Sequence, residues 1–531
     1  MSAGPKAAQA EQQFRAALAL VQGGETSRAI RLLERALTFD ARHKGVRNAL
    51  GVLRLESGDA TGAIALLKPL ARDVPDASGI QLNLGNALVA AGKAADAIAP
   101  LKRATTLDPN SGLVWYGYAR ALQTAGRVVD AELAYRRVLQ LAPAQVETRA
   151  NLAAVLNFLD RHQEGEAEAR EALRLAPFHA GAHVNLAVSL LAQHRWAEGW
   201  SEYEWREQTT LLDGQRRVWA MPRWEGEDVR GRTVLVHAEQ GFGDTLQFVR
   251  YLPLLRERNA RVVLQLPAGL ETLLRNANVA DDIVCNGDVL PAHDLQVPLT
   301  GLPHRLRLAT DAEVHVQGAA YLSPLPTRTN PLGTSHVVDA VRVGLVWAGS
   351  GTHVNDMHRS CGLPALLPLL SMKGVEWVSL QTGPRSADLA TTLAAAAKTL
   401  AGTVQVGDAA PLLKDFADTA AAIASLDVVV TVDSAVAHLA GAMGVPCWLL
   451  LPRVGLDWRW METNDAKVNS NDANERQAAK CAEAAERSGT PWYASVSCVR
   501  QATAEDWSAP VAVIGRALAE LVAERAAVVS L

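Results

Sequence analysis

The chain has 531 residues, which is too long for one hydrophobic core and predicts roughly three domains of ordinary size. Its composition is globular, with 49% hydrophobic residues, 20% charged residues and a net charge of −4. That charge, without a basic block, gives no reason to expect a nucleic acid or a membrane surface as partner.

The N-terminal sequence and the cysteines indicate the cellular compartment that we expect for the protein. The opening stretch MSAGPKAAQAEQQF has no apolar core of signal-peptide length, and no apolar run approaches the roughly 20 residues of a spanning helix. The cysteines are scattered and form no CxxC pair, which predicts reduced thiols and argues against a zinc site: Cys285, Cys361, Cys447, Cys481 and Cys498. We therefore expect a cytoplasmic protein without a membrane span.

The first part of the chain repeats every 34 residues. Prolines recur at that interval, at Pro75, Pro109, Pro143 and Pro177. A turn is expected seventeen residues before each proline, and extending the period adds one at either end: Gly24, Gly58, Gly92, Gly126, Asp160 and His194. Five positions after each turn the residue is small: Ala29, Ala63, Ala97, Ala131, Gly165 and Gly199.

This pattern resembles the tetratricopeptide (TPR) repeat, in which small residues lie where paired helices touch. The match covers residues 10–213, or about six helix pairs. Stacked pairs form a superhelix with a concave face that commonly serves for binding.

Asparagines recur in one phase of the repeat, at Asn83, Asn151 and Asn185, although Ala49 and Gly117 interrupt the row. By resemblance to TPR repeats this position faces the groove, and the row is similar to the asparagine ladder of protein O-GlcNAc transferases. An amide both donates and accepts, so such a row can hold a peptide backbone. The alternative is that each asparagine bonds locally and supports stacking.

The helical repeat ends after residue 213. Residues 214–229, with Trp219 and Trp224, are interpreted as a linker packed against another element. Strand–helix–strand patterns follow, first in TVLVHAEQGFGDTLQFVRYLPLLRERNARVVLQLP and again after residue 341. We predict an α + α/β protein in which two α/β lobes, residues 230–330 and 341–525, follow the repeats. A polar stretch at 462–490 is interpreted as an exposed insertion.

Polar residues gather where the predicted strands end, and parallel sheets bind ligands at that edge. In the first lobe they are His237, Glu239, Gln240, Gly241, Gly243 and Asp244. Asp244 lies near a helix start, where a carboxylate either caps the helix or acts as a general base.

In the second lobe, three loops offer candidates. GSGTHVNDMHRS carries His353, Asn355 and Arg359, and Gln381 ends the next strand. Asp433 and Ser434 begin a helix after a run of valines, and the helix N-terminus favours an anion such as phosphate. His438 lies one turn further on, where it is either a packed core residue or part of the site.

These stretches together resemble bacterial TPR-containing glycosyltransferases, which have a GT-B fold of two facing Rossmann-like lobes. The resemblance rests on VHAEQGFGDTLQFVRYLPLL, VGLVWAGSGTHVNDMHRS, VVVTVDSAVAHLAGAMGVPCWLLLP, DWRW and PWY. Gly243-Asp244 and Val432-Asp433-Ser434 with His438-Leu439 are also similar to family 9 glycosyltransferases, such as heptosyltransferases.

The resemblance implies inverting, metal-independent transfer from a nucleotide-activated sugar, with no cofactor besides that donor. Asp244 would be the base, and Ser434, His438 and Arg359 would hold the donor phosphate. Asp433 would orient the loop or touch the ribose. Ser434 stands where threonine is more usual and keeps the hydroxyl.

The expected function is transfer of a sugar to Ser or Thr hydroxyls of a protein bound by the repeats. Enzymes of this build include ones that modify flagellin, which makes flagellin a candidate acceptor. Two alternatives remain: a lipid-linked or polysaccharide glycan as acceptor, and a scaffold whose transferase half is inactive.

Overall fold

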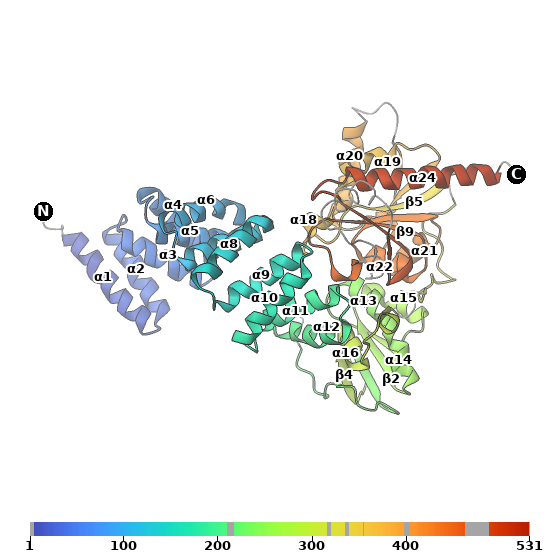
Figure 1. Ribbon diagram of the computed structural model, residues 1–531, viewed down its shortest axis with the longest axis horizontal. Helices are drawn as coiled ribbons and strands as arrows, with labels where there is room; N and C mark the ends of the chain where they lie inside the picture. Colours follow the sequence, from blue (N-terminus) through green and yellow to red (C-terminus); the bar gives the residue numbers. More distant parts are fainter. Residues whose placement is uncertain are drawn as a thin grey trace. The chain divides into compact units, whose positions relative to one another are not determined.

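The structure is a computed structural model that describes residues 5–209, 217–315, 320–334, 339–353, 355–397, 404–461 and 488–529. The chain divides into two compact units, Met1–Asn185 and Leu186–Leu531 (Figure 1). The polar insertion expected at 462–490 lies, up to residue 487, outside the described residues.

The first unit is a solenoid of paired helices. Its helices are α1 (Pro5–Gln22), α2 (Thr26–Phe39), α3 (Lys44–Glu56), α4 (Ala60–Asp73), α5 (Ser78–Ala90), α6 (Ala94–Leu107), α7 (Gly112–Thr124), α8 (Val128–Leu141), α9 (Val146–Phe158) and α10 (His162–Leu175). α11 (Ala180–Ala192) spans the division between the units, and α12 (Trp196–Tyr203) belongs to the second.

The turns inside the helix pairs fall where the 34-residue period predicts them. All six predicted turn residues have a positive φ, from 58° at His194 to 85° at Gly58. Glycine adopts this conformation without steric cost, whereas Asp160 and His194 adopt it against the usual preference of residues with a Cβ atom. The small residues that follow are buried, and Ala29, Ala63, Ala97 and Ala131 are fully so. The predicted helical repeat is therefore confirmed.

The second unit contains two sheets, which we call the first and second lobes. The first lobe holds a parallel four-stranded sheet in the order β3-β2-β1-β4. Its strands are β1 (Thr233–His237), β2 (Arg261–Leu266), β3 (Asp282–Cys285) and β4 (Leu295–Pro298). Residues 222–224 of the predicted linker pair with Gln296 of β4, and Trp224 is fully buried, as the sequence led us to expect.

The helix expected between β1 and β2 is divided into three pieces, α13 (Phe242–Phe248), η3 (Val249–Tyr251) and α14 (Leu252–Glu257). Pro253 explains the division, because proline has no backbone N–H to bond the carbonyl four residues earlier. The first lobe is completed by η4 (Ala268–Leu270), α15 (Glu271–Asn276), η5 (Leu299–Gly301), α16 (Leu302–Leu306) and α17 (Asp311–His315).

The second lobe holds a seven-stranded sheet in the order β10-β11-β9-β8-β5-β6-β7, in which the β10–β11 pair is antiparallel. The strands are β5 (Val341–Val346), β6 (Val375–Ser379), β7 (Val406–Asp408), β8 (Val428–Val432), β9 (Cys447–Leu451), β10 (Ser488–Thr490) and β11 (Tyr493–Arg500). β8 is valine-rich because it is buried on both faces: Val429 packs in one core cluster, and Val428, Val430 and Val432 in another.

Helices cover both faces of this sheet. Figure 1 shows α19 (Leu363–Leu370) and α24 (Ser508–Val529) on one side and α21 (Phe416–Ile423) and α22 (Ala435–Ala442) on the other. The remaining elements are α18 (Asp356–Arg359), η7 (Pro384–Ala387), α20 (Asp388–Ala396), η8 (Ala410–Leu412) and η9 (Trp458–Trp460). The predicted order of a helical repeat followed by an α/β region is thus observed.

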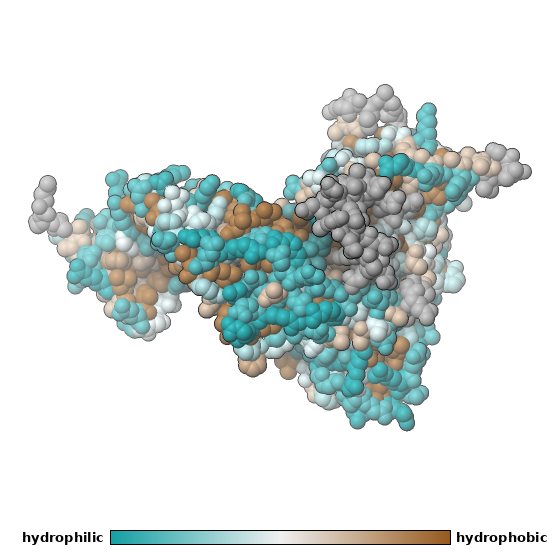
Figure 2. Space-filling view, in the orientation of Figure 1, coloured by the Kyte–Doolittle hydropathy of each residue, from teal (hydrophilic) through white to brown (hydrophobic). Residues whose placement is uncertain are grey.

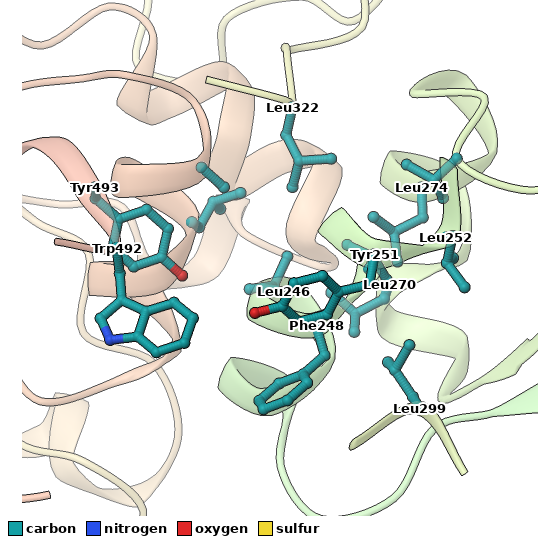
Figure 3. Close-up of a cluster of buried hydrophobic side chains, with 14 of the residues drawn as sticks. Leu246, Phe248, Tyr251, Leu252, Leu270, Leu274, Leu299, Leu322, Trp492 and Tyr493 are labelled. Carbon is teal, nitrogen blue, oxygen red and sulfur yellow. The ribbon is translucent and has the colours of Figure 1, made fainter. Parts of the chain in front are cut away.

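Aromatic and arginine side chains join the two lobes. Trp492 and Tyr493 from the second lobe face Leu246 and Phe248 from α13 across one continuous core (Figure 3). The Arg250 guanidinium, 5% exposed, donates to the Trp492 carbonyl at 3.1 Å. In the described part of the chain, no helix is long and apolar enough to cross a membrane.

Candidate functional site

The candidate site is built around Asp244, in the first turn of α13. The Asp244 Oδ2 atom accepts a hydrogen bond from the Gly241 N–H at 3.0 Å, so the carboxylate does cap its helix. Its Oδ1 atom accepts from Nη2 of Arg459 in the second lobe at 2.6 Å. Burial raises the pKa of the Asp244 carboxyl, and the Arg459 charge opposes that rise. Asp244 can therefore cap α13 with one oxygen and still take part in the candidate site with the other.

α22, which begins after Ser434, packs against the first turn of α13. A Cβ atom added to Gly243 would lie 2.8 Å from Cδ2 of His438, so the imidazole occupies the space above the glycine. This contact brings together the two motifs that the sequence singled out, one from each lobe. Any side chain at residue 243 would displace His438.

His438 is a buried, neutral imidazole. Its Nδ1 atom lies 2.9 Å from the Tyr493 hydroxyl, and its ring packs on Trp460 with centroids 5.0 Å apart. Burial and the nearby Arg459 charge lower the pKa of His438 to about 3. At neutral pH His438 therefore supplies no positive charge, and any role in holding a phosphate is limited to hydrogen bonding.

Two carboxyls of the second lobe interact with each other. Burial, with the Asp457 charge, raises the pKa of Asp433 to about 6, whereas Arg359 lowers it. Asp457 is held ionised by Arg459, which keeps its pKa below the usual range against the effect of burial. Asp433 therefore lies among charged residues from both the 349–359 loop and η9.

The loop after β5 carries Arg359, Asn355 and His353. Arg359 packs on Gly349 and donates to the Ser350 carbonyl at 3.3 Å, but its Nε atom is buried without a hydrogen-bond partner among the described residues. Asn355 donates to the Gly455 carbonyl at 2.6 Å, and its Oδ1 atom likewise finds no described partner. The Arg359 Nε atom lies 3.6 Å from Oδ1 of Asp356, an ion pair that is too long for a hydrogen bond. Buried polar atoms without hydrogen bonds are costly, so these two atoms are candidates for ligand contacts.

His353 shows which charges this loop faces. Burial and the Arg359 charge lower its pKa, and the carboxylates Asp457, Asp244 and Asp356 oppose that decrease. The loop of the second lobe therefore lies within electrostatic range of Asp244 in the first. The fold brings together Asp244, His353, Arg359, Asp433, Ser434 and His438.

Other predicted residues have structural partners. Gln381 accepts from the backbone N–H groups of Trp347 and Ala348 at 3.1 and 2.9 Å and donates to the Ala348 carbonyl, so it fixes the end of β5. The Ser434 hydroxyl lies 3.0 Å from that of Thr431. The hydrogen bonds of Gln381 are thus explained without a ligand. Ser434 precedes the first turn of α22, as the sequence predicted.

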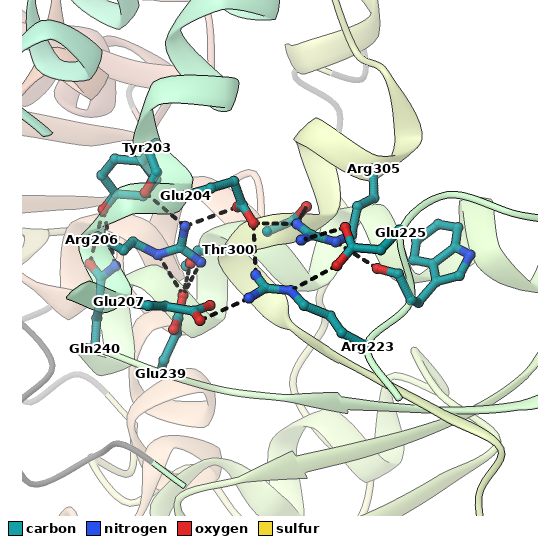
Figure 4. Close-up of polar contacts among 12 residues, drawn as sticks. Tyr203, Glu204, Arg206, Glu207, Arg223, Glu225, Glu239, Gln240, Thr300 and Arg305 are labelled. Carbon is teal, nitrogen blue, oxygen red and sulfur yellow. Dashed lines mark hydrogen bonds and ion pairs between the residues drawn. The ribbon is translucent and has the colours of Figure 1, made fainter. Parts of the chain in front are cut away.

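In the first-lobe loop, Glu239 is the carboxylate of a buried ion pair. It accepts two hydrogen bonds from Arg206, at 2.9 and 2.6 Å, and one from Thr300. Figure 4 shows this pair within a larger network that joins the segment after α12 to the first lobe. Glu239 therefore holds η1 (Glu204–Gln208) against the first lobe. Its position in the sequence did not predict this structural role.

The neighbours of Glu239 are also engaged. Gln240, at a φ of 64°, donates to the Tyr203 hydroxyl at 3.0 Å. His237 ends β1, lies 3.0 Å from Oε1 of Gln296 and stacks on Trp219 with centroids 4.3 Å apart. Burial lowers the pKa of His237 to about 4. Within this loop, Gly241, Gly243 and Asp244 are the residues that reach the candidate site.

The three solenoid asparagines bond to the repeat before their own. Asn83 donates to Oδ1 of Asn48 at 2.9 Å, Asn151 to the Tyr116 hydroxyl at 3.1 Å, and Asn185 to the Ala150 carbonyl at 2.8 Å. Each partner lies 35 residues earlier, so the bonds recur with the repeat. This is the local stacking role that the sequence left as the alternative, and a peptide contact stays a prediction.

The solenoid also exposes apolar side chains. Figure 2 shows hydrophobic residues in patches among hydrophilic ones on the visible face of its helices. The exposed large apolar residues in this unit include Leu113, Val129, Leu133 and Phe178.

Sequence reasoning did not find Arg459 or Asp457 as site residues. Both lie in the stretch DWRW, which contributed to the resemblance but had no assigned role. Only this short motif could have pointed to Arg459. Its partner Asp244 lies 215 residues away, so no local pattern in the sequence links the two residues. In the described residues, no group of three or more His, Cys, Asp or Glu side chains is arranged to hold a metal ion.

The family model described as tetratricopeptide repeat matches residues 14–78 and 82–146. The N-terminal region carries TPR repeats. Protein FlbA of Caulobacter vibrioides is 28% identical over 280 residues, or 49% of this chain and 46% of that protein. The chain therefore spans about half the length of the curated relative it matches.

Solved structures with similarity include two proteins described as TPR proteins, and MamA. TTC0263 of Thermus thermophilus is 24% identical, with a TM-score of 0.29, over 34% of this chain and 99% of that one. YrrB, described as a TPR protein with an unusual peptide-binding site, is 18% identical over 32% and 88%, with a TM-score of 0.30. MamA of Desulfovibrio magneticus is 15% identical over 34% and 99%, with a TM-score of 0.31.

Proposed function

We propose that the chain is a glycosyltransferase that moves a sugar from a nucleotide-activated donor to Ser or Thr hydroxyls of a protein acceptor. The TPR repeats would recruit that acceptor, and flagellin is a candidate. The two lobes would form a GT-B pair with the reaction at the carboxyl ends of their strands. The observation that carries the proposal is Asp244: a half-buried carboxylate at the contact between the lobes, bonded to Arg459 and within electrostatic range of His353.

The proposed reaction uses Asp244 as general base. Its carboxylate takes the proton of the acceptor hydroxyl while that oxygen bonds to the anomeric carbon of the sugar. The bond from this carbon to the donor phosphate breaks, and the phosphate leaves with the electron pair. Because attack is opposite the leaving group, the configuration inverts. The Asp244 side chain is 20% exposed, which leaves room for the hydroxyl beside the two bonds it already accepts.

The second lobe would hold the donor phosphate. Arg359 offers an Nε–H that is ion-paired with Asp356 at 3.6 Å but makes no hydrogen bond among the described residues, and α22 offers the backbone N–H groups of its first turn after Ser434. These donors would stabilise the charge that develops on the leaving phosphate, so the proposal needs no metal ion and no cofactor besides the donor. His438 would contribute as a neutral neighbour and positioning residue.

The solenoid supports a protein acceptor. TPR repeats commonly present a binding surface, and the exposed apolar side chains Leu113, Val129 and Leu133 suit a protein partner. We also propose a cytoplasmic location. Cys285, Cys361 and Cys447 are free cysteines among the described residues, as reduced thiols would be.

The test is intact-mass spectrometry of flagellin co-expressed with the chain, and of proteins captured by residues 1–185. The wild type should add a mass increment whose size identifies the sugar class. Asp244→Asn should lower transfer by about 100-fold or more, because an amide cannot accept the proton, while donor affinity is unchanged.

Asp415→Asn is the control, because Asp415 also caps a helix, accepting from the Asp418 N–H at the start of α21, but lies in a different loop. It should transfer as the wild type does. An undiminished increment with Asp244→Asn would remove Asp244 as the base. No increment on any captured protein would reject a protein acceptor, and donor turnover would then separate a glycan acceptor from an inactive scaffold.

A further inference from the structure

Arg459 joins three carboxyl or amide groups with the three nitrogens of its guanidinium. Nη2 donates to Asp244 at 2.6 Å, Nε donates to Oε1 of Gln247 at 2.7 Å, and Nη1 contacts the Asp457 carboxylate at 3.0 Å. Asp244 and Gln247 both lie on α13 of the first lobe, whereas Asp457 and Arg459 belong to the second. One side chain thus holds the helix of the candidate base from the opposite lobe.

The guanidinium is fixed in this place. Arg459 is 7% exposed, and its Cζ atom lies 4.3 Å from the centroid of the Trp458 ring. The backbone N–H of Arg459 also donates to Asp457 at 2.9 Å, which ties the residue to its own turn. Only a planar fork with donors on three nitrogens can satisfy these partners together, and lysine lacks that geometry.

The charges that face Asp244 come from several elements. Asp457 and Glu239 are carboxylates that favour a protonated Asp244, and Tyr203 and His353 lie within electrostatic range. Burial acts in the same direction as the two carboxylates. Arg459 is the cation that opposes them, at hydrogen-bonding distance.

We propose that Arg459 is the positioning residue of Asp244: from the second lobe it orients the carboxylate and keeps it ionised for proton abstraction. The catalytic part of this inference rests on the function proposed above. The ion pair itself does not, and it can be tested in the absence of any donor or acceptor. Its physical basis is that a buried carboxylate without a paired cation takes up a proton at higher pH.

The experiment follows the Asp244 carboxyl by ¹³C NMR in the full chain labelled at aspartate Cγ, with the signal assigned by its loss in Asp244→Asn. In Arg459→Gln the titration midpoint of Asp244 should move to higher pH, because the opposing cation is gone. Arg328→Gln is the control, since it removes an arginine from a different pair, with Asp418 at 2.7 Å. That variant should leave the Asp244 midpoint unchanged.

A second variant tests the inference in the opposite direction and serves if Arg459→Gln does not fold. Asp457→Asn removes the carboxylate that competes for Arg459 and repels Asp244, so the Asp244 midpoint should move to lower pH. An Asp244 midpoint that stays at the wild-type value in both variants, or in whichever variant folds, would overturn the inference.

Enzyme kinetics distinguish two effects of Arg459 on Asp244: the orientation of the carboxylate and its charge state. Arg459→Lys keeps the charge but not the fork, so we expect kcat to fall by about tenfold or more with an almost unchanged KM for the donor. In Arg459→Gln the acidic limb of the kcat pH profile should also move to higher pH. If the midpoints shift as expected but no transfer is found with any acceptor, the proposed function fails while the pairing stands. If transfer occurs and Arg459→Lys retains wild-type kcat, the positioning role fails.

Discussion

At the scale of single residues, protonation state decides what the candidate groups can do. His438 looks in sequence like a phosphate ligand one turn from a helix start, yet burial holds it neutral, with a pKa of about 3. Asp433, in contrast, has a pKa of about 6 through burial and the Asp457 charge. Residue type and spacing predicted that these groups would be near one another but not which of them carries charge.

The pH dependence of stability tests the state of His438. Between about pH 6.5, where a histidine in the unfolded chain titrates, and about pH 3, the unfolded chain binds a proton that the folded chain does not. His438 therefore lowers the free energy of unfolding as pH falls through this window. We expect His438→Gln to lose less melting temperature than the wild type on acidification from about pH 7 to about pH 4.

The matched variant for that measurement is Tyr493→Phe, which removes the hydroxyl 2.9 Å from Nδ1 of His438 but leaves the imidazole buried. It should melt at a lower temperature at neutral pH yet keep the acid sensitivity of the wild type. Equal acid sensitivity of His438→Gln and the wild type would show that His438 takes up its proton over the same pH range in the folded and the unfolded chain.

At the scale of elements, the site depends on how closely α13 approaches α22. The absent side chain of Gly243 allows His438 to lie on the first turn of α13, next to Asp244. The sequence showed the GFGD stretch as a turn, whereas the structure starts a helix at Phe242. Periodicity could not show this, because α13 has only seven residues.

Gly243→Ala tests this contact. The new methyl group would lie 2.8 Å from His438, and such overpacking typically costs about 1–3 kcal/mol. We expect the melting temperature of the second unit to fall by several degrees. Transfer should also be reduced, because the displaced His438 packs on the turn that carries Asp244. Gly269→Ala in the same lobe is the control, since its methyl group would be 3.6 Å from its nearest neighbour. Equal melting temperatures of the two variants would show that the α13–α22 contact adapts freely.

At the scale of the whole molecule, the last helix of the repeat belongs to the second unit. Trp196 and Trp200 of α12 are buried with Trp458 and Trp492 of the second lobe, and ring centroids lie 5.5–6.3 Å apart. The motifs DWRW and PWY thus contribute tryptophans to this aromatic cluster. The 34-residue period continues through α12, so the sequence assigned it to the solenoid, whereas its burial ties it to the α/β region.

Truncation tests that assignment. A chain that begins at residue 180 keeps α11 and α12, and we expect it to fold and to turn over donor slowly without modifying a protein acceptor. A chain that begins at residue 214 lacks Trp196, Trp200 and Arg206, whose loss leaves Glu239 buried without its cation. It should fail to melt cooperatively in calorimetry. Similar melting of both truncated chains would show that α12 is dispensable for the second unit.

The sequence by itself determined what depends on local spacing. Preferences that act over a few residues predicted the turn residues with positive φ and, through their recurrence, the 34-residue repeat. They also predicted the parallel strands and the polar residues at their ends. Only the tertiary structure decided which of those polar residues are already engaged. Glu239 pairs with Arg206, Gln381 bonds to the end of β5, and Asp244 pairs with Arg459, which lies 215 residues further along the chain. Such pairings depend on how the lobes pack. Packing buries these groups away from water, and this burial decides which hydrogen bonds form and which groups are charged. Neither effect produces a periodic pattern in the sequence.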